Sequence, residues 1–345
     1  MDHSETPQHL NPNLRKRLAQ RQVIEVDQYI EEILAGNLVF LSQAITLIES
    51  QQAKHQEKAQ AILAACLPHS GKSRRIGITG SPGVGKSTFI EALGQQIIEQ
   101  GHRVAVLAVD PSSPVSKGSI LGDKTRMSEL SLSDQAFIRP SPAGNALGGV
   151  AQKTRETILL CEAAGFDYIL LETVGVGQSE VAVHAMTDLF LLLLLPGAGD
   201  ELQGIKRGIV EMADLLVINK AEGDRMPLAK EAQRAYRHAL HLFPVKASGW
   251  NPPVLTCSAL QKERIDTVLK QINNYFSTIE QSAFLQNNRK EQATFWLKDT
   301  IEQQLQQLFQ EHPDVQAQLH TVEAQVRAEA ITPFQGAEML LKLFR

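Results

Sequence analysis

A glycine-rich segment near residue 80 contains the side chains with the clearest capacity for chemistry, and it matches the phosphate-binding pattern G-x-x-x-x-G-K-[ST] in full. Its residues are Gly80, Ser81, Pro82, Gly83, Val84, Gly85, Lys86 and Ser87. Glycines allow successive backbone N–H groups to turn toward phosphate oxygens, and a following helix adds the positive end of its dipole. We expect Lys86 to reach the β- and γ-phosphates, Ser87 to bind Mg²⁺ and Thr88 to lie near the α-phosphate. The segment therefore predicts a magnesium-dependent nucleotide site.

A second motif indicates which base the nucleotide carries. Asn219-Lys220-Ala221-Glu222 follows an apolar run and is similar to the guanine motif N-K-x-D. Guanine presents N1–H and N2–H as paired donors that one carboxylate can accept together, whereas adenine has no such pair. Glu222 is one methylene longer than the usual Asp, and Asp224 is the alternative acid. The motif predicts GTP and GDP as ligands, against the alternative of an ordinary polar loop.

A third element supports this prediction through its position. Cys257-Ser258-Ala259-Leu260 follows another β run and is similar to the S-A-L element whose backbone contacts guanine O6. The tripeptide is common by itself. Because Ser258, Ala259 and Leu260 come one strand and one helix after the first base motif, we expect them to contact the base.

Acidic residues follow the predicted strands at points where a magnesium-phosphate site needs them. Glu172 opens Glu172-Thr173-Val174-Gly175, a variant of the D-x-x-G motif, Asp110 ends another strand, and Asp123 lies in a loop. Carboxylates at strand C-terminal ends face the crevice in which such sheets bind ligands. We expect Asp123 and Glu172 to bind the metal or its waters, and Asp110 to orient the attacking water or a Mg²⁺-bound water. Solvated loop-end acids are the alternative for each.

The residue that would orient the attacking water is not the usual one. Val176 stands where fast GTPases often have a glutamine, and an apolar side chain cannot polarise water. Gln178, together with later charged residues or a partner, must then supply this function, so we expect slow intrinsic turnover. The predicted catalytic set is Lys86, Asp110, Glu172 and Gln178, and the later charged residues are Asp200, Glu201, Lys206 and Arg207.

Secondary-structure elements must hold these residues in place. Between the β run 76–79 and about residue 279, strand-like segments alternate with helix-like segments. The further predicted strands are 103–110, 136–139, 168–173, 189–196, 215–220 and 254–258. Such alternation predicts an α/β fold with a doubly wound, mostly parallel sheet. The most apolar run, 189–196, is typical of a central strand buried on both faces.

Helical patterns flank this core on both sides. We expect an N-terminal helical extension over 1–72, a P-loop GTPase domain over 73–280 and a C-terminal helical region over 281–345. In the last region a helix is expected to end at His312-Pro313, and two more helices to be separated near Thr332-Pro333. These helices either pack on the main domain or exchange contacts across a dimer. The apolar stripe of the first helix is Phe295, Trp296, Ile301, Leu305 and Leu308.

The composition excludes several classes of protein. The 345 residues carry a net charge of −4, which gives no polyanion-binding bias, so nucleic acid is not an expected partner. Cys66, Cys161 and Cys257 lie far apart and are odd in number, so we expect reduced, buried thiols. Residues 1–21 lack the apolar core of a secretion signal, and no apolar run approaches the ~20 residues that cross a bilayer. We expect a cytoplasmic protein.

Beyond the P-loop, four segments together resemble the MeaB/ArgK family of SIMIBI-class P-loop G proteins. Its members are GTPases associated with methylmalonyl-CoA mutase and were long labelled arginine/ornithine transport ATPases or kinases. The similarity runs from about residue 15 to the C-terminus and is most specific between Gly77 and Leu260. The segments are 110–113 (DPSS), 118–127 (GSILGDKTRM), 172–180 (ETVGVGQSE) and 196–206 (PGAGDELQGIK).

The resemblance implies a homodimeric G-protein chaperone for an adenosylcobalamin-dependent acyl-CoA mutase. Such a chaperone gates cofactor delivery by GTP hydrolysis and protects the mutase from inactivation. By position, 110–127 is similar to the first switch, 172–180 to the second, and 197–207 to a third that meets the mutase. Family members dimerise through C-terminal helices. The chain departs from the family pattern at Lys117, where a small residue is usual, and at Glu222.

Other functions stay open as hypotheses. An ATP-dependent kinase of the arginine/ornithine transport type requires a phosphoacceptor site, which no feature suggests. A nickel-type metal-insertion GTPase normally has a Cys/His cluster near the nucleotide, and the ten histidines form no ligand-spaced set with the cysteines. A scaffold that only binds nucleotide would leave the predicted acidic metal set without a purpose.

Overall fold

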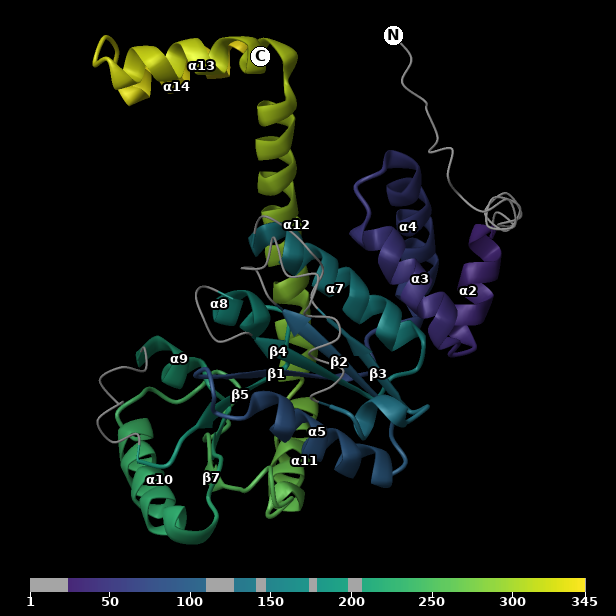
Figure 1. Cartoon of the computed structure of the whole chain (residues 1–345), viewed down its shortest axis with the longest axis vertical. Coiled ribbons are helices and arrows are strands. Elements are labelled where there is room, and N and C mark those ends of the chain that lie inside the picture. Colours follow the sequence, from purple (N-terminus) through teal and green to yellow (C-terminus); the bar gives the residue numbers. More distant parts are fainter. Residues whose placement is uncertain (1–23, 110–126, 141–146, 174–178, 198–206, 345) are drawn as a thin grey trace, which may run out of the picture. The chain divides into compact units, whose positions relative to one another are not determined.

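The computed structural model describes residues 24–109, 127–140, 147–173, 179–197 and 207–344. Within these ranges the chain forms two compact units (Figure 1). One unit comprises the described residues up to Lys72 together with Glu156–Gly165, and the other comprises the described parts of Ser73–Arg155 and of the chain from Phe166 onward. Helix α7 (Leu147–Ala163) contributes residues to both units.

The first unit contains the helices α2 (Val26–Leu34), α3 (Leu38–Glu49) and α4 (Ala53–Cys66), followed by the short 3₁₀ turn η1 (Leu67–His69). Asn37 caps α3, because its side chain accepts a hydrogen bond from the Val39 backbone N–H at 3.0 Å. Buried side chains such as Ile33, Leu41 and Ile62 lie among these helices. The helical extension expected from the sequence is confirmed here, while the domain boundaries stay predictions.

The second unit is built on a sheet of seven strands whose order is β3-β2-β4-β1-β5-β6-β7. Every pairing between neighbouring strands is parallel, which confirms the predicted sheet. From the central β1 the chain crosses to β2 and β3 on one side, returns to place β4 between β1 and β2, and then adds β5, β6 and β7 on the other side. Its direction across the sheet therefore reverses beside β1, where open α/β sheets bind ligands. The strands are β1 (Arg74–Gly80), β2 (Val104–Val109), β3 (Ala136–Arg139), β4 (Tyr168–Thr173), β5 (Leu189–Leu194), β6 (Leu215–Ile218) and β7 (Val254–Thr256).

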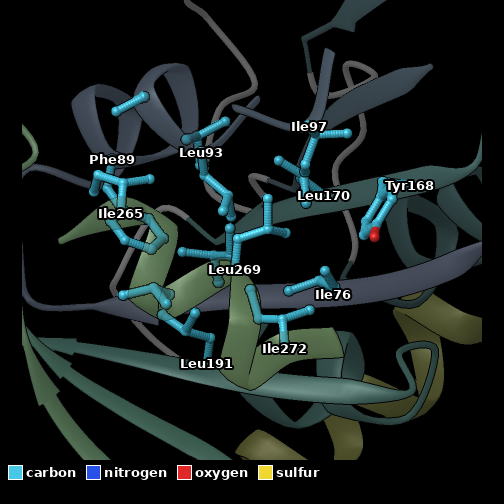
Figure 2. Packing of buried hydrophobic residues seen from close by; sticks show 14 of the residues in the cluster. Ile76, Phe89, Leu93, Ile97, Tyr168, Leu170, Leu191, Ile265, Leu269 and Ile272 are labelled. Atoms are coloured by element: carbon cyan, nitrogen blue, oxygen red, sulfur yellow. The ribbon is translucent and has the colours of Figure 1, made fainter. Parts of the chain in front are cut away.

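Helices cover both faces of this sheet, as the alternation of side chains along β5 shows. Leu189, Leu191 and Leu193 belong to a core with α5 (Lys86–Glu99) and α11 (Ile265–Gln281), which Figure 2 shows from close by. Leu192 and Leu194 pack on the other face with α9 (Arg207–Met212) and α10 (Met226–Leu240). The doubly wound architecture is therefore confirmed.

Helix α8 (Ser179–His184) approaches β1 so closely that only glycine fits between them. A Cβ atom at Gly77 would lie 2.9 Å from the side chains of both Val183 and Phe190. This contact places α8, which also carries the buried Glu180, beside the strand that leads into the P-loop.

The C-terminal part forms α12 (Phe284–Glu311), α13 (Pro313–Arg327) and α14 (Pro333–Leu343), which confirms the expected breaks. A buried ion pair anchors α12, since the Arg289 Nη2 lies 2.7 Å from an oxygen of the fully buried Asp188 side chain. Farther along α12, the indole N–H of Trp296 donates to the Ala185 carbonyl at 3.0 Å. None of the three cysteines forms a disulfide and all three are buried, as expected. In the described ranges, every helix is too short or too polar to cross a membrane.

Candidate functional site

The P-loop lies between the end of β1 and the start of α5, as its sequence predicts. Gly80, Gly83 and Gly85 have φ angles of 154°, 79° and 92°, a region that favours glycine. Two of them also lie against other groups: a Cβ atom at Gly80 would be 2.6 Å from the Leu193 carbonyl oxygen, and one at Gly85 would be 2.9 Å from the Asn219 amide nitrogen. The loop backbone can therefore adopt this path only with glycine at these positions.

Lys86 starts α5 and is buried. Its Nζ donates to the Gly80 carbonyl at 2.8 Å and to the Ser81 carbonyl at 3.4 Å. Burial lowers the pKa of Lys86, while the charges of Glu172 and Glu180 act in the opposite direction. The Lys86 ammonium thus lies against the backbone of the P-loop, and the charges of two acidic side chains favour its protonated form.

Ser87 and Glu172 are brought together at the ends of neighbouring elements. The Ser87 hydroxyl donates to a Glu172 carboxylate oxygen at 3.0 Å, and the buried Thr79 and Thr173 hydroxyls are 2.9 Å apart. The parallel pairing of Ile78 with Glu172 explains this, because it aligns the carboxyl ends of β1 and β4. Both side chains offer oxygen atoms, which are the ligands that Mg²⁺ prefers.

The remaining predicted metal and catalytic residues, Asp110, Asp123 and Gln178, lie outside the described residues. So do Val176, Lys117 and most of the three segments similar to switches. Among the residues that the structure describes, no group of three or more His, Cys, Asp or Glu side chains could hold a metal ion. Ser87 and Glu172 are therefore the part of the predicted Mg²⁺ set whose geometry is visible.

Asn219 follows β6 and is buried at 1% exposure. Its amide nitrogen donates to the Val84 carbonyl of the P-loop at 2.9 Å. Its side-chain oxygen accepts from the Ala259 backbone N–H at 3.0 Å and from the Cys257 thiol at 3.6 Å. One amide thus joins the P-loop to both segments predicted to contact guanine.

The flanking residues of these segments are positioned in part by the P-loop and in part by their own turn. Lys220 donates from Nζ to the Gly83 carbonyl at 2.7 Å. The buried Ser258 accepts from the Gln261 backbone N–H at 3.1 Å, whereas the side chain of Leu260 is exposed. The backbone of Ser258 and Ala259, rather than the Leu260 side chain, therefore lies next to Asn219.

Glu222 carries the most informative polar atom of the site. Its Oε2 is buried, and no group among the described residues forms a hydrogen bond with it. A buried carboxylate oxygen without a partner is costly, and native structures satisfy almost all such atoms. The alternative acid, Asp224, lies exposed in the 3₁₀ turn η4 (Gly223–Arg225). A ligand that donates hydrogen bonds would satisfy Glu222.

Two residues near the site were not predicted from the sequence. Arg264 donates to the Ala221 carbonyl at 2.6 Å and to the Thr256 carbonyl at 3.2 Å, so it links the first base-motif segment to the strand that leads into the second. Glu180 acts on the charge of Lys86 from the start of α8. Neither residue belongs to a motif whose spacing would have identified it, although Glu180 lies at the end of the segment similar to the second switch.

A parallel sheet whose central strand runs through G-x-x-x-x-G-K-S into a helix defines a P-loop nucleotide hydrolase. Residues 41–314 match the model of the family described as methylmalonyl Co-A mutase-associated GTPase MeaB, and the chain belongs to this family. The resemblance seen in the sequence is thereby confirmed.

Individual relatives agree with this assignment. The GTPase ArgK of Escherichia coli is 49% identical over 281 residues, which cover 81% of this chain and 85% of the relative. The methylmalonic aciduria type A homolog, mitochondrial, of Mus musculus is 44% identical over 330 residues, covering 93% and 80%. A crystal structure of a LAO/AO transport system kinase superposes with a TM-score of 0.74 at 37% identity and covers 93% of this chain and 99% of its own. The chain is a GTPase.

The close approach of Gly85 to Asn219 gives a test of the site. We expect Gly85→Ala to weaken Mg²⁺-GDP binding at least about tenfold more than Gly83→Ala, a difference of ~1.4 kcal/mol. Both positions have positive φ, so a methyl group strains both backbones, but only at Gly85 does it meet the Asn219 amide, while Gly83 faces open space. Titration calorimetry would measure both affinities. Equal losses in the two variants would contradict the contact with Asn219.

Proposed function

We propose that this GTPase recognises guanine through Asn219 and Glu222 and acts as a G-protein chaperone for an adenosylcobalamin-dependent acyl-CoA mutase. The buried Glu222 Oε2 without a hydrogen-bond partner is the observation that supports guanine recognition most directly. The family description and the name of the mouse relative support a client of the methylmalonyl-CoA mutase type. A cytoplasmic location and the absence of a nucleic-acid partner stay predictions of the sequence.

In this proposal each end of the nucleotide has its own set of residues. The Glu222 carboxylate accepts the N1–H and N2–H donors of guanine, and the backbone around Ser258 and Ala259 approaches O6. The P-loop N–H groups and Lys86 hold the phosphates. Asn219 fixes the two sets relative to each other, because its side chain bonds to both the P-loop and the Ala259 backbone.

Hydrolysis in this proposal depends on magnesium. Ser87 and Glu172 fit Mg²⁺, since both present oxygen atoms and already lie within 3.0 Å of each other. When bound, Mg²⁺ neutralises charge on the phosphate oxygens. Asp110, Asp123 and Gln178 complete the proposed set for metal binding and for orienting water. The ammonium of Lys86 stabilises negative charge on the transferred phosphoryl group.

The exposed apolar residues of α12 support the predicted homodimer. Leu297, Ile301, Leu305 and Leu308 recur at spacings of four, four and three, so they share one face of the helix, and all four are more than 45% exposed. A continuous exposed apolar face of this kind marks an interaction surface. The C-terminal helices of a second copy are the proposed occupant.

The chaperone role can be tested through GTP turnover. We expect slow GTP hydrolysis by the chain alone and an acceleration of at least about tenfold when a methylmalonyl-CoA mutase is added, equivalent to ~1.4 kcal/mol of barrier. Phosphate release with GTP or ATP would be followed with and without the mutase, and Lys86→Ala serves as the inactive control. Turnover unchanged by the mutase would contradict the chaperone role while leaving the GTPase intact. Faster hydrolysis of ATP than of GTP would favour the kinase or ATPase hypothesis.

The proposed dimer can be tested by introducing a charged side chain on the apolar face of α12. We expect the native chain to have the mass of a dimer by light scattering and Leu305→Glu to shift it to a monomer, because burying a carboxylate in an apolar interface is costly. Gln306→Glu is the matched control, since it adds the same charge at an exposed position on the opposite side of the helix. A native monomer, or a dimer that tolerates Leu305→Glu, would contradict this proposal.

A further inference from the structure

We propose that Arg264 is a positioning residue that fixes the Glu222 carboxylate against the guanine 2-amino group and so sets the base selectivity of the site. The inference rests on the guanine-recognition role proposed for Glu222. It adds a residue that belongs to none of the recognised nucleotide motifs.

The contacts of Arg264 join the first base-motif segment to the strand that leads into the second. Its Nη2 donates to the carbonyl of Ala221, the residue directly before Glu222, at 2.6 Å. Its Nε donates at 3.2 Å to the carbonyl of Thr256, in the strand that leads into Ser258. A guanidinium offers several donors in one rigid plane, which a lysine ammonium cannot reproduce. Arg264 therefore holds both segments at a fixed separation.

The backbone at these segments is held in an unusual conformation. Arg264, Lys262 and Lys220 have φ angles of 61°, 56° and 56°, so three of the five non-glycine residues with positive φ in the described ranges lie here. A left-handed backbone conformation is strained for a non-glycine residue, and such strain persists where the surrounding structure imposes it, often at functional sites.

Packing of α11 imposes the conformation of Arg264. The next residue, Ile265, is completely buried and belongs to the core that Figure 2 shows, together with Phe89 of α5. A β-bridge between Ser258 and Glu263 closes the preceding turn. The position of the guanidinium is thus set by the same core that carries the helix of the P-loop.

Arg264 also leaves Glu222 available to a ligand. Burial raises the pKa of the Cys257 thiol to about 12. The charge of Arg264 acts to lower this pKa, and the charge of Glu222 acts to raise it. The Arg264 Nη1 forms an ion pair with Glu263 at 3.3 Å, and the hydrogen bonds of Arg264 go to backbone carbonyls. The buried Glu222 Oε2 has no partner among the described residues.

A purely structural role for Arg264 makes a different prediction from a positioning role. If Arg264 only stabilised the fold, its replacement would weaken all nucleotides by the same factor. If Arg264 positions Glu222, its replacement must weaken mainly the contact between Glu222 and the guanine 2-amino group. GDP and IDP differ only in this group, so the ratio of their affinities isolates the contact.

Calorimetric titration of Mg²⁺-GDP and Mg²⁺-IDP into the native chain, Arg264→Lys and Arg237→Lys tests the inference. Arg237 is the matched control, because from α10 its Nη2 donates at 3.2 Å to the Val254 carbonyl of the same strand β7. We expect the native chain to bind GDP about tenfold more tightly than IDP, the fold-change of one hydrogen bond to a charged group. Arg264→Lys should reduce this ratio to within about twofold of unity, and Arg237→Lys should preserve it.

The outcomes separate this inference from the function on which it rests. A native chain that binds IDP as tightly as GDP would contradict the role of Glu222, and the inference with it. A native preference that Arg264→Lys retains in full would overturn the inference alone. Circular dichroism would verify that each variant is folded, and Arg264→Gln, which keeps a planar donor, replaces Arg264→Lys if the latter does not fold.

Discussion

The buried side-chain amide of Asn219 is the interaction on which the nucleotide site depends. It donates to the P-loop at Val84 and accepts from Ala259 in the second base segment, while its own backbone belongs to the first. Buried polar groups that lose a partner pay the full cost of desolvation. Losing any one of these contacts would therefore leave a buried polar group unsatisfied. The Asn219 side chain is the one that contacts both the loop that holds phosphate and the second base segment.

The sheet order makes this contact possible. Because β1, β5, β6 and β7 are neighbouring parallel strands, the P-loop and both base segments leave the same edge of the sheet. The helices that follow the first and last of these segments, α5 and α11, share one hydrophobic core, which Figure 2 shows. The buried pair of Arg289 and Asp188 anchors α12 beside α8 in the same unit. The core thus positions both the nucleotide site and the C-terminal helices.

The sequence predicted the strands and the P-loop well, because both are encoded by contiguous residues. The predicted strand 215–220 was too long, because β6 ends at Ile218. Lys220 adopts a positive φ, which no apolar pattern in the sequence reveals. The predicted apolar stripe of α12 included both Phe295 and Trp296, but adjacent residues of a helix do not share a face. Of these two side chains Trp296 is buried and Phe295 is exposed. The Arg264 contact could not be predicted, because it joins Ala221 to a residue 43 positions away.

The affinity of the chain for Mg²⁺-GDP compared with Mg²⁺-ADP, measured by titration calorimetry, tests the central claim most directly. Guanine recognition by Asn219 and Glu222 predicts that GDP binds at least about a hundredfold more tightly than ADP, a difference of roughly 2.7 kcal/mol, and that Glu222→Gln narrows the gap. Equal affinities, or a preference for ADP, would show that the Glu222 carboxylate does not recognise guanine and would contradict the account.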